Sequence, residues 1–364
     1  MKKFIIKTSE FKYPVYFGNF NIKKVVELVN QTAKYDRYFI LVDQKLNKFY
    51  GDKILKEFNS VGKRNHFLEI HSSEKQKSFP AIQKIYSELS NNSFGRDSCL
   101  VAIGGGIVGD LGGFAASTYM RGIKCVHIPT TILSAVDSSI GGKTGYNFKG
   151  TKNLIGTFYQ PVSVITSTHF FNSLPGKEIG SGIGEIIKCC FLSGKKLYDY
   201  VLCNYSLLRS LDEKVMIHVL NECISIKSSV VCQDEKERGL RKILNFGHTF
   251  AHAFESYFNF KISHGKAVVA GIIAANILSK KMRIINKNQF EQFQLLPSKV
   301  DLPKYLADFD NDRIVEIMKL DKKVRYGKLN FVLVKNFGEL VLDIKVNNSQ
   351  LNLALNKLKK TISV

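Results

Sequence analysis

In the first half of the chain, short hydrophobic segments alternate with helical ones, and this alternation restricts the possible folds more than any other feature. The strand-like segments are residues 38–42, 66–70, 99–103, 124–128 and 162–165. Segments with helical character lie between them, at residues 45–59, 80–89, 107–117 and 131–139. Strands that alternate with helices form a mostly parallel sheet with helices on both faces. The first half therefore predicts an α/β domain of the Rossmann-like type.

The pattern changes after Leu174-Pro175-Gly176. From there to about Asp321 helical periodicity dominates. Strand-like segments return only at residues 329–334 and 339–344, which flank a predicted hairpin turn. The chain has 364 residues, a length that usually corresponds to two domains. We therefore predict a Rossmann-like domain over residues 1–174 and a mainly α-helical domain over residues 175–364.

Composition excludes several classes of protein. Hydrophobic residues make up 45% of the chain and charged residues 23%, as in globular proteins. The net charge of +22 comes from lysines spread along the chain, so it indicates either a general bias or an anionic ligand. Seven cysteines without a C-x-x-C pair indicate reduced thiols. We find no signal peptide, and the longest apolar run, residues 267–278, is too short to span a bilayer, so we expect a cytoplasmic protein without a membrane partner.

The densest motif is VAIGGGIVGDLGGF at residues 101–114. Its hydrophobic strand runs into Gly104-Gly105-Gly106 and then into a helix, where backbone N–H groups can approach a phosphate. The spacing also satisfies G-x-G-x-x-G, but the usual acidic residue about twenty positions later is absent. A tight strand–helix turn without a ligand is therefore the alternative. Asp43, at the end of the first of these strands, indicates either a ribose contact or a helix N-cap.

The next segment, residues 118–161, combines glycines and hydroxyl residues with the cations Arg121, Lys143, Lys149 and Lys152. The paired Thr130 and Thr131 can bond a ribose or an amide, and the glycines before Lys143 present its ammonium to a phosphate or carboxylate. A solvated basic loop is the alternative interpretation.

The helical half carries the candidate metal ligands. Glu185 and Lys188 are neighbours on one helix face, a spacing most typical of a surface ion pair. We expect Arg241, Asn245, His248 and His252 to lie along one face of a single helix, with Arg241 either in the site or on the surface. With His264, these histidines offer nitrogen donors typical of catalytic zinc, although core histidines are the alternative. The spacing does not decide which histidines bind or which carboxylate joins them.

In their order and spacing these motifs resemble the 3-dehydroquinate synthase family, from about residue 38 to residue 334. The resemblance rests on GGGIVGDLGGF, YMRG, PTT, VDSSIGGKTG, KNLIG.FYQP, GEIIK, GLR..LN.GHTF.HA.E, HG..V..G and M..DKKV. Two positions depart from the family pattern: Ser72-Ser73 replaces an Asp-Gly pair, and Ala251 replaces a glycine between the paired histidines. The first makes NAD contacts in that loop less secure, and the second should only tighten helix packing.

The resemblance implies an enzyme that uses NAD and a divalent metal ion, zinc or cobalt. The implied metal ligands are Glu185, His248 and His264, and His252 then faces the substrate. The implied NAD contacts are Asp43, Glu74, Lys77, Gly105, Gly106, Ile107, Val108, Gly109, Asp110, Thr130, Thr131, Lys143 and Lys152. The implied substrate groups are Arg121, Asp137, Lys143, Asn153, Lys188, Lys227, Arg241, Asn245, His252 and one lysine of Asp321-Lys322-Lys323.

The reaction that the resemblance implies converts 3-deoxy-D-arabino-heptulosonate 7-phosphate to 3-dehydroquinate and phosphate in the shikimate pathway. C4 is oxidised, phosphate is eliminated, C4 is reduced again, and the opened ring closes into a carbocycle, so NAD is not consumed. One alternative is a cyclase that makes an inosose or a valiolone, whose substrates lack the carboxylate expected to need Arg241 and Asn245. Others are a metal-dependent glycerol or alcohol dehydrogenase and a basic nucleic-acid-binding protein, for which we find no module. We expect a small-molecule substrate, no nucleic acid and a homodimer.

Overall fold

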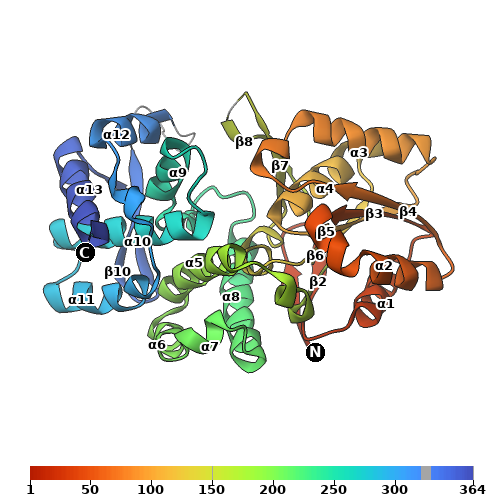
Figure 1. Cartoon of the computed structure of the whole chain (residues 1–364), viewed down its shortest axis with the longest axis horizontal. Coiled ribbons are helices and arrows are strands. Elements are labelled where there is room, and N and C mark those ends of the chain that lie inside the picture. The colour runs from red at the N-terminus through yellow and green to blue at the C-terminus, as the bar shows by residue number, and fades with distance from the viewer. Residues whose placement is uncertain (150, 321–328, 364) are drawn as a thin grey trace. The chain divides into compact units, whose positions relative to one another are not determined.

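The computed structural model describes residues 1–149, 151–320 and 329–363, and its packing divides the chain into two compact units (Figure 1). Unit 1 comprises Met1–Pro175 and Lys227–Lys236. Unit 2 comprises Gly176–Ile226 and Glu237–Val364. A short segment from the middle of the helical half thus packs with the first unit. Asp321, Lys322 and Lys323 lie outside the described residues.

The strands are β1 (Lys2–Lys7), β2 (Lys12–Gly18), β3 (Arg37–Asp43), β4 (Arg64–Ile70), β5 (Ser98–Gly104), β6 (Lys124–Pro129), β7 (Lys143–Phe148), β8 (Thr151–Phe158), β9 (Ser163–Ser167), β10 (Asn330–Asn336) and β11 (Glu339–Lys345). The helices are α1 (Ile22–Thr32), α2 (Gln44–Ser60), α3 (Phe79–Asn91), α4 (Gly106–Thr118), α5 (Gly176–Ser193), α6 (Lys195–Cys203), α7 (Tyr205–Arg209), α8 (Glu213–Gln233), α9 (His248–Tyr257), α10 (His264–Lys281), α11 (Lys287–Leu295), α12 (Asn311–Leu320) and α13 (Asn348–Ser363).

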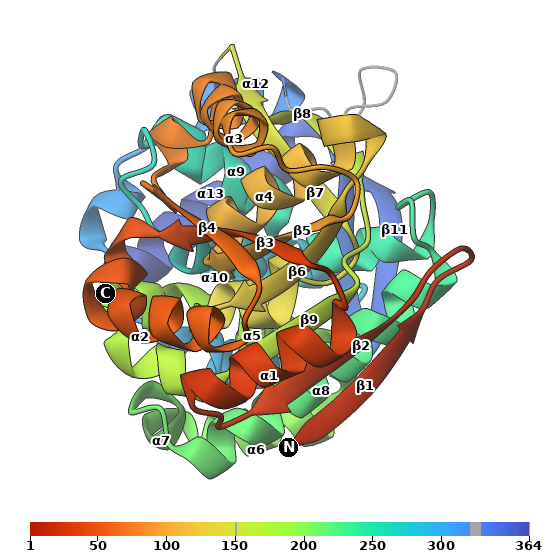
Figure 2. The same ribbon diagram turned by 90° about the vertical axis from the view of Figure 1, so that its right-hand side faces the viewer.

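Unit 1 is built on a seven-stranded sheet with the order β1-β2-β9-β6-β5-β3-β4 (Figure 2). Only β1 and β2 pair antiparallel, and the remaining pairs are parallel, so the predicted mostly parallel sheet is confirmed. We did not predict β1 and β2. β1 is an edge strand with three lysines and mostly exposed side chains, so it lacks the hydrophobic run that marks a buried strand.

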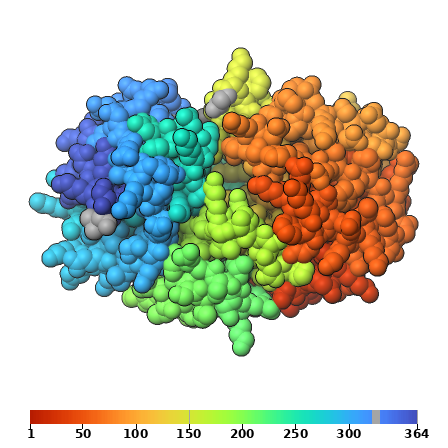
Figure 3. All heavy atoms as spheres, viewed as in Figure 1, coloured from red at the N-terminus to blue at the C-terminus, as the bar shows by residue number. Residues whose placement is uncertain are grey.

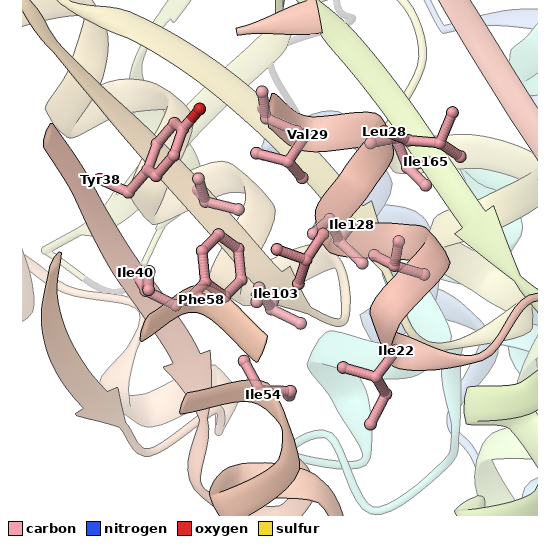
Figure 4. Close-up of a cluster of buried hydrophobic side chains, with 14 of the residues drawn as sticks. Ile22, Leu28, Val29, Tyr38, Ile40, Ile54, Phe58, Ile103, Ile128 and Ile165 are labelled. Atoms are coloured by element: carbon pink, nitrogen blue, oxygen red, sulfur yellow. The ribbon is translucent and has the colours of Figure 1, made fainter. Parts of the chain in front are cut away.

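Helices cover both faces of this sheet, as predicted. Tyr38 and Ile40 of β3 point to one face, where they pack with side chains of α1 and α2 such as Phe58 (Figure 4). The alternate residues Phe39 and Leu41 point to the other face, where they pack against α3 and α4. A strand that is buried on both faces has no polar side, and this explains why the middles of β3 and β5 are continuous apolar runs.

A second hairpin in unit 1, β7–β8, was not predicted. Its tip (yellow) projects from unit 1 in the space-filling view (Figure 3). Gly145 of β7 faces Gly156 of β8, and a Cβ on Gly145 would lie 2.4 Å from the Ile155 carbonyl oxygen. Glycines that permit such a close approach also lower strand propensity, and for that reason the segment resembles a loop in the sequence. The helix predicted over residues 131–139 is shorter and contains a π-helical turn at Ser134–Ser138.

Unit 2 is mainly helical, as predicted, and α10 lies at its centre. The apolar run at residues 267–278 is fully buried there, and α10 packs against α5, α9 and α13. Gly184 of α5 meets Gly265 of α10 so closely that a Cβ on Gly184 would lie 2.2 Å from the Gly265 oxygen. This close crossing brings the first turn of α10 beside the middle of α5. The predicted hairpin is confirmed as β10–β11.

One helix among the described residues, α8, is long and apolar enough to cross a membrane by length and composition alone. Of its most apolar window, 56% is buried within the protein. Core helices pass the same test, so this is weak evidence for a membrane span. All seven cysteines are free thiols, as their spacing predicts.

Candidate active site

The glycine motif forms the junction between β5 and α4 in unit 1. Gly105 is the N-cap of α4 and has no side chain. No cap side chain therefore accepts a hydrogen bond from the first N–H groups of the helix. A Cβ on Gly106 would lie 2.9 Å from the Ser138 hydroxyl, and one on Gly105 would lie 3.3 Å from Thr131 Cγ2. Backbone N–H groups at a helix N-terminus suit a phosphate, so these residues fit the predicted contact with the pyrophosphate of NAD.

Asp43 lies between β3 and α2 and is buried. Its Oδ1 accepts a hydrogen bond from the Lys45 N–H at 2.8 Å, so the helix-cap alternative describes this structure. Its Oδ2 accepts from the Ser72 hydroxyl at 2.5 Å. Ser72 is a position where the chain departs from the family pattern, and here it supplies a donor to a carboxylate. The ribose contact of Asp43 stays a prediction.

The side chain of Lys77 joins two other predicted site residues. This side chain is buried and its ammonium contacts the carboxylate of Asp110 on α4. The same ammonium donates to Asn153 Oδ1 at 2.5 Å. Burial raises the pKa of Asp110, and the neighbouring Lys77 opposes this shift. Lys152 lies 4.0 Å from Glu74. The structure thus gathers the Glu74–Lys77 turn, the β7–β8 hairpin and the start of α4.

The remaining predicted residues of unit 1 lie around β6 and the segment after it. Thr130 is buried and its N–H donates to the Gly104 oxygen at 3.0 Å. The ammonium of Lys227 donates to the backbone oxygen and to Oδ1 of Asp137, both at 2.5 Å, across 90 residues of sequence. Arg121 and Lys143 are exposed. Ile107, Val108 and Gly109 form the first turn of α4.

Three candidate metal ligands converge in unit 2. Glu185 lies in the middle of α5, His248 is the first residue of α9, and His264 is the first residue of α10. Glu185 Oε1 lies 3.3 Å from His248 Nε2 and 3.1 Å from His264 Nε2. Their ligand atoms all lie within 4.8 Å of one another. Two imidazoles and one carboxylate are a donor set of catalytic zinc sites.

The expectation of one helix from Arg241 to His252 is wrong. Residues Leu240–Asn245 form a separate 3-10 helix, and α9 begins only at His248. Gly247 separates the two with φ of +78°, a left-handed conformation that ends a helix and that glycine adopts without strain. The spacing of four, three and four residues therefore does not place these side chains on one helix face. The break instead puts His248 at the start of a new helix.

Contacts of the second ring nitrogen fix the orientation of both histidines. His248 Nδ1 lies 3.1 Å from the Phe246 carbonyl, and because a carbonyl only accepts, Nδ1 donates. His264 Nδ1 lies 3.2 Å from Glu255 Oε1. The Nε2 atoms of both histidines therefore point toward Glu185. Sequence reasoning gave Glu255 no role, although it closes the GHTF.HA.E motif and lies seven residues, or two helical turns, after His248.

The interpretation of Glu185 and Lys188 as a surface pair is wrong. Lys188 Nζ lies 2.5 Å from Glu185 Oε2, and the two side chains are 2% and 0% exposed. Burial opposes ionisation of Glu185, but Lys188 and His248 outweigh it and hold its pKa well below the usual range. Burial and Lys188 lower the pKa of His248 to about 4. Burial also lowers the pKa of His264, but hydrogen bonds to Glu185 and Glu255 raise it to about 10.

The predicted substrate groups of unit 2 lie near these ligands in the sequence and differ in their burial. Arg241 is only 2% exposed, so the surface alternative for this residue is wrong. Asn245 Nδ2 donates to Glu237 Oε1 at 2.7 Å. The ring of His252 is half-buried, with its centroid 5.5 Å from that of His248 and 6.5 Å from that of His264.

Comparison with solved structures identifies the fold. The chain matches 2-deoxy-scyllo-inosose synthase in complex with carbaglucose-6-phosphate, NAD+ and Co2+, with a TM-score of 0.89 and 23% identity over 98% of this chain and 99% of that one. It also matches 2-epi-5-epi-valiolone synthase from Streptomyces hygroscopicus subsp. jinggangensis 5008 with NAD+ and Zn2+ bound, with a TM-score of 0.89 and 21% identity over 97% and 98% of the two chains. The fold is that of the sugar-phosphate cyclases.

Sequence comparison narrows the class to one family. Residues 67–181 match the model of the 3-dehydroquinate synthase N-terminal region, and residues 182–324 match that of its C-terminal region. The 3-dehydroquinate synthase of Pelagibacter ubique strain HTCC1062 is 40% identical over 362 residues, 98% of each chain. The chain belongs to the 3-dehydroquinate synthase family. Its function is the family's step in the shikimate pathway, on a small phosphorylated sugar substrate.

Proposed function

We propose that unit 1 is the NAD-binding domain and that unit 2 is the domain that binds the metal and the substrate carboxylate. The convergence of Glu185, His248 and His264 carries this proposal. A buried group of two imidazoles and one carboxylate, with both Nδ1 atoms already engaged, offers its remaining donors to one cation.

The residues present fit both absent groups. The N-terminus of α4 at Gly105 and Gly106 fits a dinucleotide phosphate, and the N,N,O donor set fits Zn2+ or Co2+. When bound, NAD supplies reversible hydride transfer at C4, and the metal supplies Lewis-acid polarisation of the neighbouring hydroxyls. The net change is loss of phosphate, so we propose a carbon–oxygen lyase that needs NAD but does not consume it.

The chain's own cations bind and orient the two acidic ends of the substrate. The guanidinium of Arg241 forms a planar fork that binds a carboxylate with two parallel hydrogen bonds, and its burial strengthens such a pair. The substrate phosphate is proposed to bind to residues of unit 1, namely Arg121, Lys143 and Asn153. His252 faces the substrate. Lys188 holds the charge of Glu185 in a buried environment, which keeps this carboxylate ionised as a ligand.

Asp137 and Lys227 form a separate positioning pair. Lys227 bonds both the backbone oxygen and the carboxylate of Asp137, and so fixes the π-helical turn at Ser134–Ser138 that borders the glycine motif. We propose that this pair positions the residues of unit 1 that bind the substrate. We propose that Asn245 has the same positioning role beside Arg241 in unit 2.

We propose that the protein acts as a homodimer in the cytoplasm, with no nucleic-acid or membrane partner. The diffuse distribution of lysine supports only the lack of a nucleic-acid partner, because nucleic-acid-binding proteins concentrate their positive charge in a patch or a stripe. Light scattering of a nuclease-treated sample should give twice the chain mass of 41.1 kDa and no nucleic-acid absorbance.

The test of the reaction is a comparison of phosphate release with NADH formation. With the heptulosonate phosphate in large excess over NAD, phosphate should exceed NAD many times over while absorbance at the NADH band stays flat. An NADH signal that rises with product would instead show a dehydrogenase. Turnover of a phosphorylated sugar that lacks the carboxylate would favour an inosose- or valiolone-type cyclase.

A further inference from the structure

One residue of unit 1, Asn147 of β7, joins two segments that lie 73 residues apart in the sequence, and the proposed mechanism gives it no role. Its backbone N–H donates to the Lys77 oxygen at 2.9 Å. Its side-chain Nδ2 donates to Glu74 Oε1 at 2.7 Å and to the Glu74 oxygen at 3.2 Å. Its Oδ1 accepts from the Asn153 N–H at 2.9 Å. The side chain is half-buried between these partners.

The partners of Asn147 are themselves predicted to contact NAD and substrate. Asn153 has φ of +48°, a conformation that costs a residue other than glycine about 1 kcal/mol and therefore needs local support. Asparagine adopts this conformation more readily than other residues besides glycine, and here two hydrogen bonds hold it, one from its backbone N–H to Asn147 and one from Lys77 to its side-chain oxygen. Lys77 in turn contacts Asp110 of α4. A continuous set of contacts thus runs from the β7–β8 hairpin through Asn147 to the helix that carries the glycine motif.

We infer that Asn147 is a positioning residue that holds Glu74, Lys77 and Asn153 in place for NAD and substrate. The inference rests on the proposed function, in which Glu74 and Lys77 contact NAD and Asn153 contacts the substrate. An amide suits this position because it donates and accepts at once. An aspartate would keep the acceptor for Asn153, but it would lose the donor and set a second carboxylate against Glu74.

The first test measures the NAD dissociation constant by isothermal titration calorimetry without substrate, so that no turnover is involved. Asn147→Ala should weaken NAD binding about tenfold, since it frees Glu74 and Asn153 from their hydrogen bonds. Asn147→Asp should weaken it at least as much, because like charges then face each other. Asn92→Ala is the matched control: Asn92 donates to the Glu88 oxygen at 2.9 Å and to its carboxylate at 3.4 Å, and NAD binding should stay within about twofold of wild type.

The second test reverses the hydrogen bond. Asn147→Asp combined with Glu74→Gln lets the amide at position 74 donate to the carboxylate at position 147. In a double-mutant cycle that includes Glu74→Gln alone, which reports the loss of the proposed Glu74–NAD contact, the double variant should bind NAD at least about fivefold more tightly than the two single effects predict. A residue needed only for stability would shift the melting temperature without this rescue. Should Asn147→Ala unfold unit 1, the reversed pair still decides the matter.

The outcomes separate the inference from the function on which it rests. If the wild-type chain shows no NAD binding, the proposed function fails. If the wild-type chain binds NAD and the Asn147 variants bind it within about twofold, or the reversed pair gives no rescue, the inference is overturned while the function stands.

Discussion

The two candidate histidine ligands in this chain differ in the group that orients them. His248 donates to a neutral backbone carbonyl, whereas His264 is held by the buried carboxylate of Glu255. A carboxylate behind an imidazole fixes the ring and makes its other nitrogen a stronger donor. We therefore propose that Glu255 supports the metal ligand His264, although it is not itself a proposed ligand.

We expect Glu255→Gln to weaken metal binding by roughly 10–100-fold. The substitution keeps the size of the side chain but removes the charge that supports His264. Competition with a chromophoric chelator measures the affinity, and the visible absorbance of bound Co2+ reports the geometry of the ligands. Glu88→Gln is the matched control, because Glu88 contacts His66 Nε2 at 2.9 Å in unit 1. Equal metal affinity in wild type and Glu255→Gln would remove Glu255 from the site.

We expect Arg241 to decide which substrates the enzyme accepts. Loss of a charge-assisted pair in a buried site costs about 2–5 kcal/mol, so Arg241→Ala should lower kcat/KM roughly 30- to several-thousand-fold with the heptulosonate phosphate. Arg241→Lys should fall in the same range, because an ammonium lacks the planar fork. Metal content and NAD affinity should stay near wild type, and steady-state kinetics together with melting curves separate catalysis from folding. A loss below about threefold would leave the substrate carboxylate without an identified partner.

At the scale of elements, hydrophobic patterning predicts the strands that are buried on both faces. It misses strands that are exposed or that depend on glycine. The sequence predicts β3 and β5 because continuous apolar runs mark strands covered on both faces. β1 and β7 were missed because one is a lysine-rich edge strand and the other depends on paired glycines. The break between the 3-10 helix at Leu240–Asn245 and α9 was missed because a single glycine inside an apparent helical period gives little warning.

One buried side chain of β6 makes the stability of unit 1 depend on pH. His127 lies against Gly109 and Gly113 of α4, and burial lowers its pKa to about 4 from an ordinary value of 6.5. The unfolded chain then binds a proton below pH 6.5 that the folded chain binds only near pH 4. The free energy of unfolding should therefore fall as the pH falls through this window, by roughly 2–3 kcal/mol at pH 4.5.

Denaturant unfolding at pH 7 and pH 4.5 checks this expectation, with metal present so that the histidines of unit 2 stay bound. His127→Gln has no titrating group at this position, so its loss of stability between the two pH values should be smaller than that of wild type by that amount. Identical pH dependence in both proteins would show that His127 is not buried in neutral form.

For the whole molecule, the sequence predicts the candidate site residues more readily than the contacts between distant segments that bring them together. The resemblance supplied Glu185, His248 and His264 as ligands, while spacing left the choice among the histidines open. The close crossing of α5 and α10 at Gly184 and Gly265, which brings these residues together, depends on contacts far apart in the sequence. The packing of Lys227–Lys236 with unit 1 has the same origin, because no local pattern reports it.

The most direct test of the central claim is calorimetric titration of Co2+ into the metal-stripped full chain, compared with His264→Ala and His252→Ala. The account predicts one tightly bound ion per chain in wild type and in His252→Ala, and loss of that ion in His264→Ala. Phosphate release should return with the ion in wild type only, with His252→Ala remaining slow. Full phosphate release by the stripped wild-type chain, or unchanged Co2+ binding in His264→Ala, would contradict the assignment of Glu185, His248 and His264 as the metal site.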